Sequence, residues 1–177
     1  MTGSIVITGF MGCGKTEVAR CLAQRLGFEM VDLDEVITKR ENRTPAELIS
    51  EAGEPFFRAV ETHTLAALLT QDTAAVISLG GGAWIESSNR NLIAHYESTS
   101  VWLDTPFAVC WQRIEADPKD RPLGRTIQQA MELYDHRRPI YQLARIHIQV
   151  TGEETPDELA ATIQSELGEV PEPRTPQ

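Results

Sequence analysis

The sequence predicts an α/β fold in which a five-stranded parallel sheet carries helices on both faces. Short runs rich in β-branched residues alternate with segments whose apolar residues recur at helical spacing. Strands that are separated by helices pair in parallel, and the helices then cover both faces of the sheet. Neither an internal repeat nor a linker appears before residue 168. Such sheets bind their ligands at the carboxyl ends of the strands, where we expect the functional residues.

The first half of the chain has clear start and stop signals for its elements. A buried β-branched run ends at Gly9, and the amphipathic helix after it ends at Gly27, which serves as its C-cap. Thr44 and Glu47 form a capping box around a proline, so another helix starts there and Gly53 ends it. The expected elements are a strand at 4–8, a helix at 16–26, a strand at 30–33, helices at 34–40, 45–52 and 55–69, and a strand at 75–79.

The second half continues the alternation after one interruption. The polar stretch 116–125 contains two prolines and a glycine, which predicts a mobile surface loop. Helical spacing returns after it at Ile127, Ala130, Met131 and Tyr134. The other expected elements are a strand at 100–104, a helix at 106–115, a strand at 146–150 and a capped helix at 155–167. We therefore expect one domain over residues 1–167 and a flexible, proline-bearing tail over 168–177.

The composition is that of a soluble globular protein. The chain has 177 residues, and its 16 Lys and Arg stand against 26 Asp and Glu, so its formal net charge is −10. This balance argues against nucleic-acid binding, which usually needs a basic face. No apolar stretch approaches the roughly 20 residues that span a bilayer, and the N-terminus lacks a signal-peptide pattern. Three cysteines without CxxC spacing favour a reducing compartment, and we expect a cytoplasmic protein.

The stretch 9–16, GFMGCGKT, matches the phosphate-binding pattern GxxxxGK[ST] between a predicted strand and a predicted helix. Its glycines allow backbone N–H groups to converge on phosphate oxygens, and the following helix adds its positive N-terminus. Lys15 is expected to reach the β- and γ-phosphates, and the Thr16 hydroxyl to ligate Mg²⁺. Cys13 is interpreted as a small filler, since no base or redox partner is visible near it. The motif predicts a nucleoside triphosphate and Mg²⁺ without naming the reaction.

A kinase, a GTPase-like switch and a motor fragment all contain such a loop. A motor usually needs more chain and partner subunits. A switch GTPase carries an NKxD-type guanine reader, and no such run accompanies the three asparagines, Asn42, Asn89 and Asn91. A small-molecule kinase is therefore favoured.

Asp32 and Asp34 form an acidic pair at the end of the second predicted strand. Residues at i and i+2 of a strand point the same way, so both carboxylates are expected to face the crevice. One could help to hold Mg²⁺ and the other could accept a proton from a substrate hydroxyl. The alternative is that Asp34 only caps the helix that follows it.

Two further patterns allow a structural or a functional interpretation. Arg58 and Glu61 stand at i and i+3 of one helix and can form a surface ion pair, or an arginine fork held for a carboxylate. Gly80, Gly81 and Gly82 directly follow a strand. They form either a plain turn or a place where bare backbone N–H groups approach a ligand.

Six motifs, in this order and spacing, resemble those of the shikimate kinase family. They are the loop 9–16, Asp32-x-Asp34, GExxFRxxE over 53–61, the glycines 80–82, RPL over 121–123 and RxPxY over 137–141. The likeness covers about residues 5–167 and implies a P-loop fold of the nucleoside monophosphate kinase type, with a single kinase domain and a mobile lid at about 115–124. It implies transfer of the γ-phosphate of ATP to the 3-hydroxyl of shikimate, on the route to chorismate and the aromatic amino acids.

The resemblance also implies roles for individual residues. Asp34, Lys15 and Arg121 are the implied catalytic residues, with Asp34 as the base and Arg121 on the lid. The implied ATP-binding residues are Gly12, Cys13, Gly14, Lys15, Thr16, Glu17, Arg113, Arg121 and Pro156. The implied substrate-binding residues are Asp34, Phe57, Arg58, Glu61, Gly80, Gly81, Gly82 and Arg137. Thr16 and Asp32 are the implied ligands of one Mg²⁺ per subunit.

Some positions depart from the family pattern, and two other functions stay open. Pro45 and Ile49 replace residues expected in the substrate-binding segment, and Gly124 stands where a second leucine is usual in the lid. The other functions are a kinase of the same fold for another polyol acid, with gluconate the nearest, and a catalytically silent homologue. ATP and shikimate are the implied partners, nucleic acid and membranes are not expected, and a monomer is the default.

Overall fold

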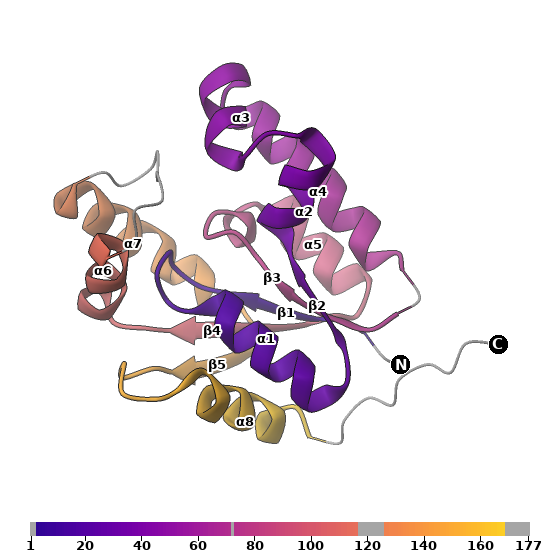
Figure 1. Ribbon diagram of the computed structural model, residues 1–177, viewed down its shortest axis with the longest axis vertical. Coiled ribbons are helices and arrows are strands. Elements are labelled where there is room, and N and C mark those ends of the chain that lie inside the picture. Colours follow the sequence, from indigo (N-terminus) through magenta and orange to yellow (C-terminus); the bar gives the residue numbers. More distant parts are fainter. Residues whose placement is uncertain (1–2, 72, 117–125, 169–177) are drawn as a thin grey trace.

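The computed structural model describes residues 3–71, 73–116 and 126–168. Its sheet has five parallel strands in the order β2-β3-β1-β4-β5. The strands are β1 (Ile5–Thr8), β2 (Glu29–Asp32), β3 (Ala75–Ser78), β4 (Thr99–Asp104) and β5 (Ile146–Gln149). The predicted fold class is confirmed. Because all five strands run the same way, their carboxyl ends meet along one edge of the sheet (Figure 1).

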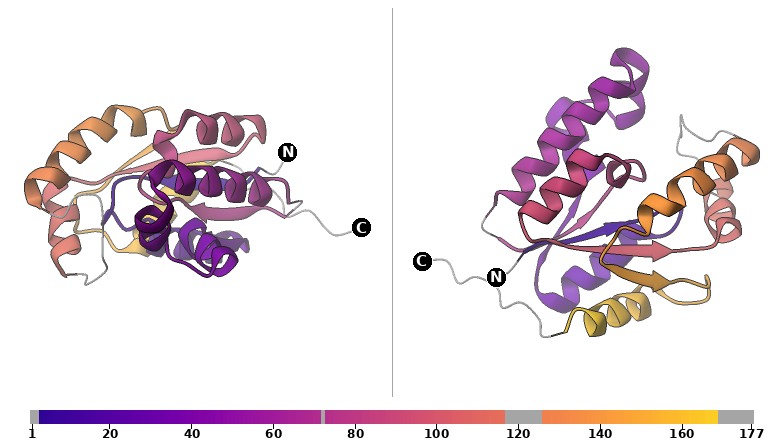
Figure 2. Two further views of the ribbon diagram at one scale, coloured as in Figure 1. Left: turned by 90° about the horizontal axis from the view of Figure 1, so that it is seen from above. Right: turned by 180° about the vertical axis from the view of Figure 1, so that it is seen from behind.

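Helices cover both faces of the sheet. On one face α1 (Lys15–Leu26) and α8 (Pro156–Glu166) lie side by side, and Arg25 of α1 pairs with Asp157 of α8 (Figure 1). The other face carries α5 (Ser87–His95) and α7 (Ile127–Tyr141), which come forward in the rear view (Figure 2). The central strands are fully buried between these layers, as expected for a parallel sheet.

Three helices project beyond the sheet and pack on one another. They are α2 (Leu33–Glu41), α3 (Pro45–Ala52) and α4 (Glu54–Leu69), with α3 farthest from the sheet (Figure 1). The remaining helix, α6 (Phe107–Ala116), packs against α7 on the opposite side of the strand ends (Figure 1). The phosphate-binding loop therefore lies at the strand ends between two groups of helices.

Three details differ from the expectations. The short helix η1 (Ala83–Ile85) and α5 were not predicted, because their apolar residues give little helical pattern. The α6 helix continues to Ala116, so the start of the expected loop is helical. Ile127 and Met131 of α7 are 49% and 46% exposed, although their spacing suggested a core-facing stripe.

Most of the expected lid and tail lies outside the described residues, so both stay predictions. Among the described residues, no helix combines the length and the apolar content that crossing a bilayer requires.

Candidate active site

The predicted phosphate-binding loop joins β1 to α1. Its conformation depends on glycine at position 12, where φ is 76° and a Cβ atom would lie 2.6 Å from the carbonyl oxygen of Cys110. An alanine there would combine strain at a positive φ with a clash against backbone that cannot move aside. Cys13 is buried in the loop, in agreement with its interpretation as a filler.

Lys15 is the first residue of α1, one position earlier than expected. Its Nζ atom donates hydrogen bonds to the carbonyl oxygens of Gly9 at 3.0 Å and Phe10 at 2.8 Å. The ammonium group is thus held over the loop, at the positive N-terminus of α1. This places a positive charge at the point where the loop amides would receive phosphates.

The first turn of α1 and the ends of β2 and β3 bring oxygen atoms together beside the loop. The Thr16 hydroxyl donates to Asp32 Oδ2 at 2.9 Å and lies 3.4 Å from Ser78 Oγ. The other carboxylate oxygen of Asp32 accepts from the backbone N–H groups of Asp34 and Glu35, which fixes its direction. Hydroxyl and carboxylate oxygens are the ligands that Mg²⁺ prefers, so Thr16 and Asp32 fit a magnesium site.

The placement of Asp34 differs from the expectation. β2 ends at Asp32, and Asp34 lies in the first turn of α2, so the two side chains do not share a strand face. The alternative that Asp34 caps the helix is also wrong, because Asp32 is the N-cap. The carboxylate of Asp34 reaches the glycine turn after β3, where a Cβ atom on Gly80 would lie 2.7 Å from its Oδ1 atom. Gly80 therefore leaves room for the Asp34 carboxylate beside bare backbone.

Arg58 forms a buried ion pair with Glu61, so the interpretation as a surface pair is wrong. The Arg58 side chain is 14% exposed and that of Glu61 is 1% exposed. Arg58 Nη1 lies 3.0 Å and 2.9 Å from the two carboxylate oxygens of Glu61. The guanidinium stacks on the buried ring of Phe57, 5.1 Å from its centroid, and lies so close to Gly82 that a side chain there would overlap it. Arg58 is therefore fixed between an aromatic ring and bare backbone.

Burial raises the pKa of Glu61 to about 7, although the neighbouring Arg58 acts to lower it. Asp34 and Glu86 raise the pKa of Glu61 further by smaller amounts, because their negative charges disfavour a negative charge on Glu61. A carboxyl group of this kind titrates near neutral pH beside the arginine that it holds.

Because the folded protein holds this proton more tightly than the unfolded chain, stability is expected to fall as pH rises from about 4.5 to about 7. The contribution of Glu61 over this interval is at most roughly 3 kcal/mol. Glu61→Gln removes the titrating group, so its free energy of unfolding should change less with pH than that of the wild type. Urea unfolding at intervals between pH 4.5 and pH 8 measures both slopes, and equal slopes would contradict the assignment.

Arg137 comes to the same glycine turn from α7. It is buried, and its Nη1 atom donates to the carbonyl oxygen of Gly81 at 3.3 Å. The hydroxyl of Tyr141, one helical turn later, donates to the same carbonyl. The structure thus brings Arg58 and Arg137 to one turn, with Arg58 at Gly82 and Arg137 at Gly81.

The contacts that hold α7 in this position were not predicted from the sequence. Arg138 Nη2 pairs with Asp104 at 2.9 Å, at the end of β4, and its guanidinium lies over the ring of Trp102. Trp84 Nε1 donates to the carbonyl oxygen of Ile140. The sequence did hold two signals for the first of these contacts. Arg138 directly follows Arg137, and Asp104 ends a predicted strand.

The remaining nucleotide-site candidates lie at the far side of the loop. Arg113 of α6 donates to the carbonyl oxygen of Gly12 at 3.3 Å, and its Nη1 atom would lie 3.3 Å from a Cβ atom on Gly14. Pro156 is the first residue of α8, after a turn that packs against α6 through Gly152. The Glu17 carboxylate instead pairs with Arg20 on the exposed side of α1. Arg121 lies outside the described residues.

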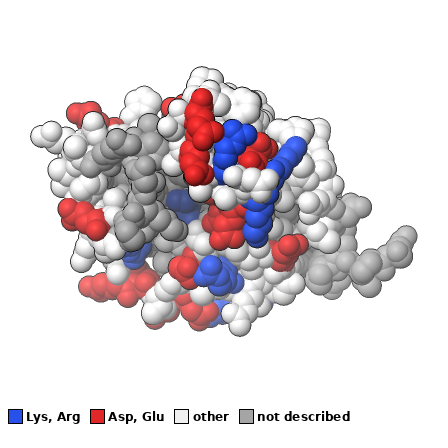
Figure 3. Space-filling model, turned by 45° about the horizontal axis from the view of Figure 1, so that its top comes forward, with Lys and Arg blue, Asp and Glu red and all other residues white. Residues whose placement is uncertain are grey.

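Charges of both signs are intermixed around the crevice. Acidic and basic side chains lie next to one another on the face that comes forward when the top of Figure 1 is tilted toward the viewer (Figure 3). Recognition of an anion at this face therefore depends on individual arginines rather than on a uniform positive field.

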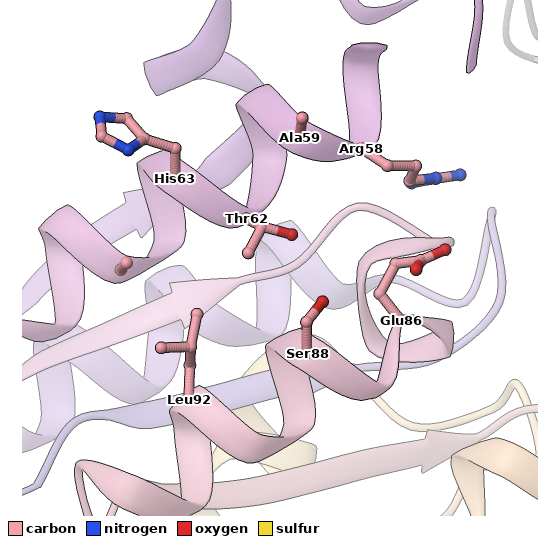
Figure 4. A pocket seen from close by; sticks show the side chains of 8 residues that line it. Arg58, Ala59, Thr62, His63, Glu86, Ser88 and Leu92 are labelled. Carbon is pink, nitrogen blue, oxygen red and sulfur yellow. The ribbon is translucent and has the colours of Figure 1, made fainter. Parts of the chain in front are cut away.

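A separate open cleft of about 580 Å³ lies between α4 and α5. Thr62 and Ser88 face it from the two helices, with Arg58 and Glu86 toward one end (Figure 4). The lining residues are Arg58, Ala59, Thr62, His63, Ala66, Glu86, Ser88 and Leu92. Of the candidate site residues that the structure describes, only Arg58 borders it, so this cleft is distinct from the loop and turn at the strand ends.

Comparisons with known proteins agree with this geometry. A family model described as shikimate kinase matches residues 11–168. A shikimate kinase from Cereibacter sphaeroides is 37% identical over 172 residues, covering 96% of this chain and 84% of its own. The structure of a shikimate kinase from Acinetobacter baumannii in complex with shikimate matches with a TM-score of 0.87 and 33% identity, covering 94% of this chain and 93% of that one. A gluconokinase from Sinorhizobium meliloti, with 16% identity and a TM-score of 0.59, shares the fold alone.

Proposed function

This chain belongs to the shikimate kinase family, and on that premise we propose that it transfers the γ-phosphoryl group of ATP to the 3-hydroxyl of shikimate. The product would be shikimate 3-phosphate, on the route to chorismate and the aromatic amino acids. The observation that carries the proposal is the pair of buried arginines at one glycine turn, Arg58 at Gly82 and Arg137 at Gly81. Two guanidinium groups beside bare backbone suit a carboxylate, and shikimate carries one.

The phosphate loop is proposed to bind the nucleotide. Its backbone N–H groups would receive the phosphates, and Lys15 would exchange its contacts with the carbonyls of Gly9 and Phe10 for contacts with phosphate oxygens. Arg113 and Pro156 lie on the side of the loop where the base of the nucleotide would rest. The Glu17 side chain pairs with Arg20, so we propose that Glu17 contributes to nucleotide binding through its backbone.

Thr16 and Asp32 would hold one Mg²⁺ through the oxygen atoms that now contact each other at 2.9 Å. The metal would neutralise charge on the transferring phosphates. Asp32 also caps α2, so the direction of its carboxylate depends on the same turn that carries Asp34.

Asp34 is proposed to accept the proton of the attacking hydroxyl. Its carboxylate lies against Gly80, in the same turn that Arg58 and Arg137 contact, so a ring molecule held by its carboxylate could present a hydroxyl to Asp34. Phosphoryl transfer depends mainly on positioning and charge neutralisation, which this arrangement supplies. Arg121 stays a catalytic prediction from the sequence.

We also infer that one chain is sufficient and that it acts in the cytoplasm. All proposed site residues belong to a single kinase domain, which supports a monomer. Among the described residues the three cysteines are free, as expected in a reducing compartment.

A coupled assay of ADP release tests the proposal against the two other functions. Purified protein is given ATP and Mg²⁺ with shikimate, with gluconate or with no acceptor. We expect turnover with shikimate that exceeds both other arms by orders of magnitude. Faster turnover with gluconate would indicate the polyol-acid kinase, and no turnover in any arm would indicate a silent homologue.

Replacing Arg137 by alanine is expected to weaken shikimate binding about ten- to a hundredfold, because a charge-assisted contact is worth roughly 1.5–3 kcal/mol. Arg137→Lys should not restore binding, since an ammonium group lacks the guanidinium fork. Calorimetric titration of shikimate measures the Kd. Arg145→Ala, at an exposed position before β5, is the matched control and should bind as the wild type does. An unchanged Kd for Arg137→Ala would count against the clamp.

A further inference from the structure

Glu54, the first residue of α4, makes a contact with Arg58 that the proposed reaction does not yet use. One carboxylate oxygen of Glu54 accepts from Arg58 Nε at 3.3 Å and from Arg58 Nη2 at 3.0 Å. Glu61 binds the same guanidinium only through Nη1. Two carboxylates from one helix therefore hold different edges of Arg58.

The geometry of the guanidinium shows which N–H donors of Arg58 the two glutamates leave unused. The group is planar and has five N–H donors in a fixed fork. Glu54 fills the side edge formed by Nε and Nη2, and Glu61 occupies Nη1. Nη2 carries a second proton that Glu54 does not take, so the group keeps at least one N–H donor for a further carboxylate oxygen. Hydrogen bonds from a guanidinium to a carboxylate are charge-assisted and therefore strong.

The two glutamates differ in how firmly they are held. The Glu61 side chain is 1% exposed, whereas that of Glu54 is 44% exposed. The backbone of Glu54 is nevertheless constrained, because it stands between Gly53, which has a φ of 88°, and Pro55, which fixes its own φ. Glu54 is thus an accessible side chain on a fixed backbone position, four residues before the arginine that it contacts.

We propose that Glu54 is a positioning residue that orients Arg58 for the carboxylate of the substrate. This inference rests on the proposed function, since it concerns the same clamp. Phe57 and Gly82 confine the plane of the guanidinium, and Glu61 holds it at Nη1. Glu54 fixes the second edge and so opposes rotation within that plane. Holding a donor group in its bound orientation lowers the cost of ordering it when the ligand arrives.

The same contact has an opposite interpretation, in which Glu54 competes with the substrate. A second carboxylate on Arg58 would then have to leave before shikimate could bind. The two interpretations predict opposite changes in the affinity for shikimate when Glu54 is removed. If Glu54 positions Arg58, its removal weakens shikimate binding, and if Glu54 competes, its removal strengthens binding. The second proton of Nη2 lets a substrate carboxylate bind while Glu54 stays in place, which favours positioning.

The test compares Glu54→Ala and Glu54→Gln with the wild-type enzyme in steady-state assays. Glu54→Ala is expected to raise the KM for shikimate roughly five- to twentyfold, with kcat and the KM for ATP within about twofold of wild type. Glu54→Gln keeps an oxygen acceptor, so it should recover part of the loss. Glu51→Ala, which removes an exposed partner of Arg43 in the preceding helix, is the matched control and should leave all three constants unchanged.

A double-mutant cycle separates positioning from a general effect of charge. In an Arg58→Lys background the side edge of the guanidinium no longer exists, so Glu54→Ala should change kcat/KM for shikimate less than twofold. Thermal denaturation of each variant accompanies the assays and should show similar Tm values.

A lower KM for shikimate in Glu54→Ala, an unchanged KM, or an equal effect in the Arg58→Lys background would overturn the proposal. A wild-type enzyme that does not phosphorylate shikimate would contradict the proposed function instead.

Discussion

Replacing Asp34 by asparagine is expected to lower kcat for shikimate by about 10²–10⁴, the usual loss when a general base is removed. Asparagine keeps the shape of the side chain beside Gly80 but cannot accept the hydroxyl proton. Asp34 belongs to α2 and not to the loop between β1 and α1, so the affinity for an ATP analogue should stay near that of the wild type. Single-turnover rates and a nucleotide titration measure the two quantities separately.

Asp135→Asn is the matched control for this variant. Asp135 is exposed on α7, the helix that also carries Arg137, and its replacement removes the same charge from the chain. We expect its kcat to be unchanged. If the kcat of Asp34→Asn were within threefold of the wild-type value, Asp34 would not be the general base.

Lys15→Ala is expected to lower kcat/KM for ATP by about 10²–10³, a typical loss for a group that stabilises charge in the transition state. The alanine variant has no ammonium group to move from the carbonyls of Gly9 and Phe10 to the phosphates. Shikimate binding in the absence of nucleotide should remain intact, because the arginine clamp is built from other elements. Initial rates over a range of ATP concentrations, with a separate shikimate titration, test both statements.

Lys39→Ala, at an exposed position near the end of α2, controls for the loss of one positive charge. It should behave as the wild type in both measurements. If Lys15→Ala kept more than a third of the wild-type kcat/KM for ATP, the loop lysine would not be needed for phosphoryl transfer.

The sequence was sufficient for the sheet and the phosphate loop, because these depend on local patterns. β-branched runs, glycines at fixed offsets and capping boxes are read within a few residues. Thr44 and Thr155 indeed cap α3 and α8 with the predicted boxes. The expected lid with Arg121 stays a prediction.

The placement of the other site residues depends on contacts between segments that are distant in the sequence, and local patterns carry no information about such contacts. Asp34 was expected on a strand because its spacing from Asp32 fits one, but the Asp32 carboxylate captures the next backbone N–H groups and starts α2 there. The Arg58–Glu61 spacing could not show burial, which comes from the packing of η1 and α5 against α4. The contact of Tyr141 with Gly81 joins residues from α7 and the turn after β3.

The central place of β1 in the sheet has a consequence for the order in which the molecule is assembled. Ile5 faces Val76 of β3 on one side and Thr99 of β4 on the other. The strand that leads into the phosphate loop is made before both of its neighbours. During ribosomal synthesis one of its edges therefore stays unpaired until β3 (Ala75–Ser78) has emerged, and the other until β4 (Thr99–Asp104) has emerged. Contacts of such long sequence separation slow folding and expose unpaired edges in the meantime. Affinity for nucleotide should therefore arise late in refolding, together with the β1–β4 ladder rather than with the earliest helices.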